Sequence, residues 1–313
     1  MIEGILSVLN PISITTGAML ISSTAAEPSV GLALYDPLHS YALYDKCISA
    51  VTHRVYKSQS AANTGNDPTD VNNRTGTPFW WSDDGPSNRY KMFDGQSDSQ
   101  TVVTSPLTIV LRPGFFNAVY LGNLSSELID VVVRDAPLGN IIFNYSGVLE
   151  NSQPADWYEY FFSPFRPQRD YLISGLDPYN LAEITITLSS PLDLVKCGLF
   201  AIGDLQPLGQ TLRGVEVEPI TYSYINTDSF GVTNITRRAR AKNMVVKGYL
   251  ELVEASYVAD VLSETQDVPC LWVASAGTNY SPARVFGLGK GKITLDTPSP
   301  NICTVDITVK GFI

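Results

Sequence analysis

The chain has 313 residues, of which 44% are hydrophobic and 17% are charged, and its formal net charge is −10. A chain of this length can bury a large core, and length alone favours about two domains. An acidic surface repels polyanions, so the charge argues against general nucleic-acid binding. The 23 glycines, 20 prolines and 16 tyrosines are typical of β-rich proteins with many turns, and we therefore expect a mainly β fold.

The N-terminal third predicts a small β module. Residues 1–32 combine an apolar start with small residues, which indicates an N-terminal arm or a first strand that lacks its partner. In residues 33–90, apolar positions around Tyr44 and Tyr56 form two short runs separated by a turn, as in a hairpin of half-buried strands. The run "NTGNDPTD" at 63–70 has turn-forming residues at nearly every position.

Residues 91–212 contain seven β-branched or aromatic runs bounded by Gly, Pro, Asn or Asp. Regular short strands at this spacing predict an antiparallel β-sandwich, of the jelly-roll kind. The aromatic and proline-rich segment 152–168 is expected to be an ordered loop over one edge of it.

Residues 213–313 predict a C-terminal β-rich assembly domain with one short helix. The helix is expected to span about ten residues from Ala255, because Tyr257, Val258, Val261 and Leu262 form one apolar face. The string "GLGKG" at 287–291 lacks the spacing of a phosphate-binding loop, so a β-turn is expected there. The alternating run "ICTVDITVKGFI" predicts a closing strand of a second sheet.

Residues that could support chemistry are sparse. Cys47, Cys197, Cys270 and Cys303 each neighbour apolar residues and lack a C-x-x-C spacing, which predicts buried free thiols. The two histidines offer little material for a metal site, and segment 94–101 lacks the glutamate of a calcium loop. We expect no metal, no other cofactor and no enzymatic activity.

The N-terminus has no basic region and no apolar run is long enough to span a bilayer, so neither a signal peptide nor membrane insertion is expected.

Two groups of side chains are candidates for binding. Arg238, Arg240 and Lys242 alternate along a predicted strand, either as a charged edge that blocks aggregation or as a subunit interface toward an acidic copy of the chain. Trp80 and Trp81 are adjacent, so in a strand one side chain can enter the core while the other stays outside. An exposed indole can stack on a sugar ring, and core packing of both rings is the alternative.

The stretch "YDPLHSYALYDKCISAVTHRVYKSQSAANTGNDPTD" followed by "WW" resembles the small chitin-binding type of carbohydrate-binding module. Its pattern of aromatic, acidic and turn residues is matched by Tyr41, Asp45, Tyr56, Pro68 and Trp80 or Trp81. Tyr44 stands where that family usually has glycine. The resemblance implies that Trp80, Trp81, Tyr41 and Tyr56 contact a glycan.

Such modules joined to a β-sandwich are similar to tail and virion proteins of tailed bacteriophages, and the C-terminal run resembles the last strand of phage tail-tip and distal tail proteins. These resemblances imply a structural component of a virion tail, made in the host cytoplasm, that forms an oligomeric ring or trimer. Its partners would be copies of itself, other tail proteins and a host cell-surface glycan. The alternatives are a stand-alone carbohydrate-binding protein and, less favoured, a glycan hydrolase.

Overall fold

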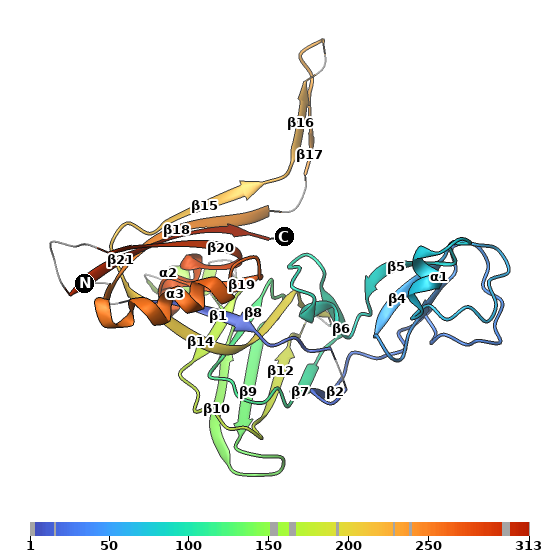
Figure 1. Ribbon diagram of the computed structural model, residues 1–313, viewed down its shortest axis with the longest axis horizontal. Helices are drawn as coiled ribbons and strands as arrows, with labels where there is room; N and C mark the ends of the chain where they lie inside the picture. The colour runs from blue at the N-terminus through green and yellow to red at the C-terminus, as the bar shows by residue number, and fades with distance from the viewer. Residues whose placement is uncertain are drawn as a thin grey trace.

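The computed structural model describes residues 4–15, 17–150, 156–162, 167–191, 194–227, 229–237, 240–295 and 301–312. The fold is mainly β, as predicted, with 50% of residues in strands and 10% in helices. Its sheets are antiparallel. Figure 1 shows two packed sheets, a small module to one side and a narrow two-stranded projection.

The larger sheet has nine strands and contains a closed barrel. Its order is β11 (Tyr171–Ser174), β8 (Ala118–Gly122), β14 (Leu199–Thr211), β1 (Ile5–Pro11), β19 (Cys270–Val273), β20 (Arg284–Leu295), β21 (Ile302–Gly311), β18 (Arg240–Glu251) and β15 (Glu216–Thr221). Because β14 also pairs with β18, the six strands from β14 to β18 close on themselves. Closure leaves these strands without free edges and encloses their own core.

The predicted helix is present as α3 (Ala255–Glu264), which begins and ends as expected. Val258 and Val261 are buried against the barrel core, whereas Tyr257 is 47% exposed. The barrel core also contains Trp272, whose indole is fully buried and donates a hydrogen bond to the Gly287 carbonyl oxygen.

The glycine-rich run at 287–291 is part of strand β20, so the predicted β-turn is wrong. A Cβ atom at Gly289 would overlap the ring of Trp272, and one at Gly291 would overlap Leu262. These glycines therefore make room for two large side chains that pack on the strand, which is a common reason for glycine inside a sheet.

The smaller sheet has five strands. Its order is β10 (Ile141–Val148), β9 (Leu128–Arg134), β12 (Glu183–Ser189), β7 (Leu107–Leu111) and β2 (Leu20–Ser23). Alternate residues of β12, such as Ile184 and Ile186, are buried against Val119 and Phe200 of the larger sheet in one continuous core. The region therefore packs as a β-sandwich, flanked by the pair β6 (Thr101–Thr104) and β13 (Leu194–Cys197).

The N-terminal residues are not a free arm. β1 lies inside the nine-stranded sheet between β14 and β19, and β2 is an edge strand of the five-stranded sheet. The expected boundary at residue 212 also falls within the larger sheet, because β14 before it and β15 after it belong to that sheet. The sandwich and the C-terminal region thus share one sheet.

The small module contains the predicted hairpin, formed by β3 (Lys46–Ile48) and β4 (Arg54–Ser58), with β5 (Trp81–Pro86) as a third strand. The polar run at 63–70 leads into α1 (Val71–Thr75), where the Asp70 side chain accepts a hydrogen bond from the Asn72 amide. The short turn η1 (Lys91–Phe93) follows the module.

Several short elements complete the chain. β16 (Tyr224–Thr227) and β17 (Thr233–Thr236) pair with each other and form the narrow projection in Figure 1, called the arm below. The described part of the expected loop at 152–168 includes a helix, α2 (Trp157–Phe162). The turn η2 (Leu252–Glu254) directly precedes α3, and the turn η3 (Thr278–Ala283) directly precedes β20.

Candidate functional site

Three of the four predicted glycan-contacting residues form the core of the small module. Trp81 is 0% exposed, and Tyr41 and Tyr56 are also buried. The Trp81 indole donates a hydrogen bond of 2.8 Å to the Asn66 carbonyl oxygen, and its ring lies edge-on to Tyr41 at 5.1 Å. Buried rings present no face to a sugar, so these three residues act as scaffold and their predicted role in glycan contact is corrected.

Trp80 is the partly exposed member of the pair. Its main chain is fixed, because the Trp80 carbonyl oxygen accepts hydrogen bonds from the Gln59 amide and the Asn63 side chain. The neighbouring Phe79 is 45% exposed. Aromatic side chains that keep part of their surface exposed can stack on a flat ligand.

The residues of the predicted basic strand lie outside the small module, and two of them line a pocket. Arg238 lies outside the described residues. Arg240 is exposed at the first position of β18, opposite Thr221 of β15, and Lys242 is half-buried two residues further along. Both side chains line a pocket of about 690 Å³ that neither the charge pattern nor the strand pattern had indicated.

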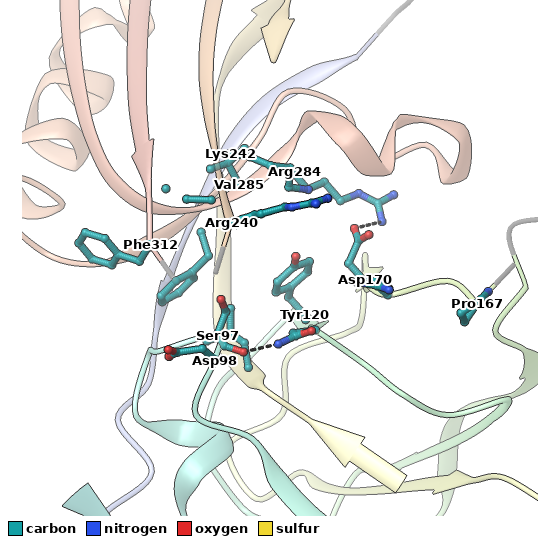
Figure 2. Close-up of a pocket in the computed structure, with 17 residues that line it drawn as sticks. Ser97, Asp98, Tyr120, Pro167, Asp170, Arg240, Lys242, Arg284, Val285 and Phe312 are labelled. Carbon is teal, nitrogen blue, oxygen red and sulfur yellow. Dashed lines mark hydrogen bonds and ion pairs between the residues drawn. The ribbon is translucent and has the colours of Figure 1, made fainter. Parts of the chain in front are cut away.

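The pocket lies between strands that are distant in sequence. Its lining includes Tyr120 of β8, Leu199 of β14, the start of β18 and β20, and the segment after β21. Figure 2 shows Arg240, Lys242 and Arg284 along one side, Ser97 and Asp98 on the opposite side, and the Tyr120 ring between them.

Arg284 is the most unusual residue of the pocket, because its charged side chain is only 2% exposed. Its Nη2 atom donates hydrogen bonds of 2.9 and 2.7 Å to the carbonyl oxygens of Ala276 and Gly277. Its Nη1 atom lies 4.0 Å from Asp170 Oδ2. Its Nε atom is buried and has no hydrogen-bond partner among the described residues. Burial of such a charge is costly unless the charge is paired and hydrogen-bonded.

Asp170 faces Arg284 across the floor of the pocket. Its Oδ1 atom accepts a hydrogen bond of 3.1 Å from the Ser281 hydroxyl. Its Oδ2 atom is buried and finds no hydrogen-bond partner in the part of the chain that the structure describes. Burial raises the pKa of Asp170, although Lys242 and Arg284 act in the opposite direction. Burial likewise lowers the pKa of Arg284 and raises that of Tyr120. Perturbed groups that converge in a cavity are typical of binding sites.

Arg284, Asp170 and Tyr120 were not predicted as site residues from the sequence, because each lies in a different segment of the chain. One signal was available, since Arg284 opens the buried run "RVFG" at an inward-facing position. An arginine at such a position indicates either a partner or a ligand.

The arm is the second candidate site. Ile225 and Ile235 are 63% and 61% exposed, and they stand opposite each other in the β16–β17 register. Tyr224 is exposed as well. The arm thus carries apolar side chains away from the body of the protein.

Among the residues that the structure describes, no cluster of three or more His, Cys, Asp or Glu side chains could hold a metal ion. Across the same residues, every helix is too short or too polar to cross a bilayer. No protein-family model and no curated protein sequence matches the chain.

Proposed function

We propose that the chain is a structural subunit of a bacteriophage tail, in the tail-tip or baseplate region, and that its arm joins it to further copies in a ring or trimer. The arm is the observation that carries the assembly role. The assignment to a phage tail rests on the sequence resemblances. This assignment implies a location in the virion, synthesis in the host cytoplasm and other tail proteins as partners.

The arm needs a partner surface to be stable. Its two strands pair only with each other among the described strands, and an isolated two-stranded hairpin is at best marginally stable in water. Exposed apolar side chains on a projecting element mark a contact surface. A second copy is the favoured partner, because most soluble oligomers are built from identical subunits.

The register of the neighbouring strands allows a clean test. Thr221 of β15 is paired with Arg240 of β18, so residues 222–239 can be replaced by an Asn-Gly turn that closes a β-hairpin directly. We expect the shortened chain to keep the circular dichroism spectrum of a β protein while its mass by light scattering falls from an oligomer to a monomer.

A pair of point variants provides the matched control. Ile225→Lys with Ile235→Lys should also reduce the oligomer mass, because both substitutions place charge on the arm. Leu138→Lys changes a residue that is 97% exposed between β9 and β10, and it should leave the mass unchanged. The assembly role is wrong if the wild-type chain is monomeric, or if the shortened chain retains the wild-type mass.

Glycan contact through the small module is a second candidate function, favoured by the partly exposed Trp80 beside Phe79. It could serve a tail subunit or a stand-alone carbohydrate-binding protein. A tail subunit and a stand-alone carbohydrate-binding protein can be distinguished by the effect of removing the arm. A stand-alone protein binds its sugar equally well without it.

A further inference from the structure

The pocket beneath β18 has a charge opposite to that of the chain as a whole. Among the described residues that line it, the charged ones are Arg169, Arg240, Lys242, Arg284, Asp98 and Asp170, which leaves two cations in excess. The chain itself carries a net charge of −10. A local concentration of positive charge with low-dielectric walls attracts an anion.

Two polar atoms beside the pocket have no hydrogen-bond partner among the described residues. Arg284 Nε is a buried donor and Asp170 Oδ2 is a buried acceptor, and the described part of the chain offers neither a hydrogen-bond partner. A hydroxyl group both donates and accepts, so hydroxyls can satisfy the two atoms together. A bare carboxylate can satisfy only the arginine.

The remaining walls fit a sugar ring. Phe286 and Phe312 line the pocket and are each half-buried, so they offer apolar surface to the C–H face of a pyranose. The volume of about 690 Å³ lies within the range of small-molecule sites, roughly 300–1,000 Å³.

An acidic side chain from a second copy fits less well. A glutamate or aspartate has no donor for Asp170 Oδ2, and it would bring a third carboxylate near Asp98 and Asp170. Like charges at short distance disfavour each other's ionised forms.

We propose that this pocket binds an acidic sugar of the hexuronic acid class. The carboxylate lies toward Arg240 and Lys242, and ring hydroxyls lie between Arg284 and Asp170. The site belongs to a single chain, so the proposal does not depend on assembly through the arm or on glycan contact at Trp80.

The test measures binding of sodium galacturonate, sodium glucuronate and neutral galactose to the full-length chain by titration calorimetry and ligand-observed NMR. We expect at least one uronate to bind at least about tenfold more tightly than galactose, because hydrogen bonds to charged groups are stronger than neutral ones. Arg240→Gln should weaken uronate binding by about tenfold or more without unfolding the chain, because Arg240 is exposed at the start of its strand.

Lys247→Gln is the matched control. It removes the same charge from the same strand at an exposed position outside the pocket, and it should leave uronate affinity unchanged. The proposal is overturned if neither uronate binds, if galactose binds as tightly as both uronates, or if Arg240→Gln has no more effect than Lys247→Gln. Binding of a poly-glutamate peptide at the pocket, without uronate binding, would assign the site to an acidic protein segment instead and overturn the sugar. A fall in oligomer mass with Arg240→Gln would place Arg240 in a subunit interface, which also contradicts the proposal.

Discussion

Trp80 and Trp81 are neighbours in sequence with different surroundings. Trp81 is enclosed by Tyr35, Tyr41 and the Asn66 carbonyl oxygen, whereas Trp80 is only partly buried. From the sequence this division and core packing of both rings were alternatives, the division because side chains of adjacent strand residues point to opposite faces. In the structure Trp81 is the first residue of β5 and Trp80 lies just before it. The sequence did not indicate which of the two would be buried, since that depends on the register of β5 against β4.

Substituting the two tryptophans separately should give unequal results. Trp81→Ala removes a fully buried indole and should lower the free energy of unfolding by about 3–5 kcal/mol. Trp80→Ala should cost clearly less stability, because the hydrogen bonds to its main chain are retained. If Trp80 contacts a glycan as proposed, this variant should instead reduce attachment of the assembled particle to cells. Urea unfolding and a cell-binding assay measure the two effects. Equal losses of stability would mean that both rings act as core and would remove the case for glycan contact.

The four cysteines are buried free thiols, as their apolar sequence neighbours predicted. Burial raises the pKa of Cys47, Cys197 and Cys270 from 9.0 to about 12. The spacing alone indicated free thiols, but the size of the shift follows from packing in three different cores, which local sequence does not show.

These thiols should make the protein less stable at alkaline pH. Between pH 9 and about 12 the unfolded chain releases thiol protons that the folded chain retains. The contribution of the three protonated thiols to the free energy of unfolding is therefore complete below pH 9 and is lost as the pH rises through this window. Urea midpoints at about pH 8 and about pH 11 measure the loss. Cys197→Ala should reduce the pH dependence, because one such proton is removed. An unchanged difference between the two pH values would contradict the assignment.

At the scale of elements, strands and the helix were predictable and their partners were not. The alternation in β12 and β21 and the 3.6-residue pattern of α3 are local signals, and the structure confirms them. The glycines of β20 were wrongly predicted to form a turn. They leave space for the side chains of Trp272 and Leu262, which belong to other segments of the chain. The arm gave no clear signal, since its apolar residues are few and its neighbours in sequence are polar.

At the scale of the whole molecule, long-range pairing decides the domain organisation. β1 pairs with β14 and β19, which lie roughly two hundred residues or more away in the chain, so the first strand completes a barrel assembled mainly from the last third of the sequence. The same pairing brings together the pocket residues of β8, β18 and β20. A site of this kind is invisible to motif analysis, because no two of its charged strands are adjacent in sequence.

The small module differs from this pattern, because its core is drawn from residues within 35–81 alone. The segments that lead into and out of it lie together, since Arg89 Nε donates a hydrogen bond of 2.7 Å to the Ala25 carbonyl oxygen. Further contacts join the module to this base, where His53 stacks on Tyr90 and its ring nitrogen lies 2.8 Å from a Glu27 carboxylate oxygen. The module is therefore an inserted unit whose two connections are close enough to be joined.

Removing the module should separate assembly from surface attachment. We expect replacement of residues 27–87 by a short Gly-Ser linker to leave a folded chain, because Tyr90 and Met92 remain to fill the sandwich core and the Ala25–Arg89 contact is preserved. The oligomer should keep its subunit number by light scattering, since the arm is untouched, while attachment to cells is lost together with Trp80. A linker of the same composition inserted after Leu138, between β9 and β10, is the control and should affect neither property. If the shortened chain stays soluble but becomes monomeric, the module itself holds the subunits together, and the arm cannot be the main contact between them.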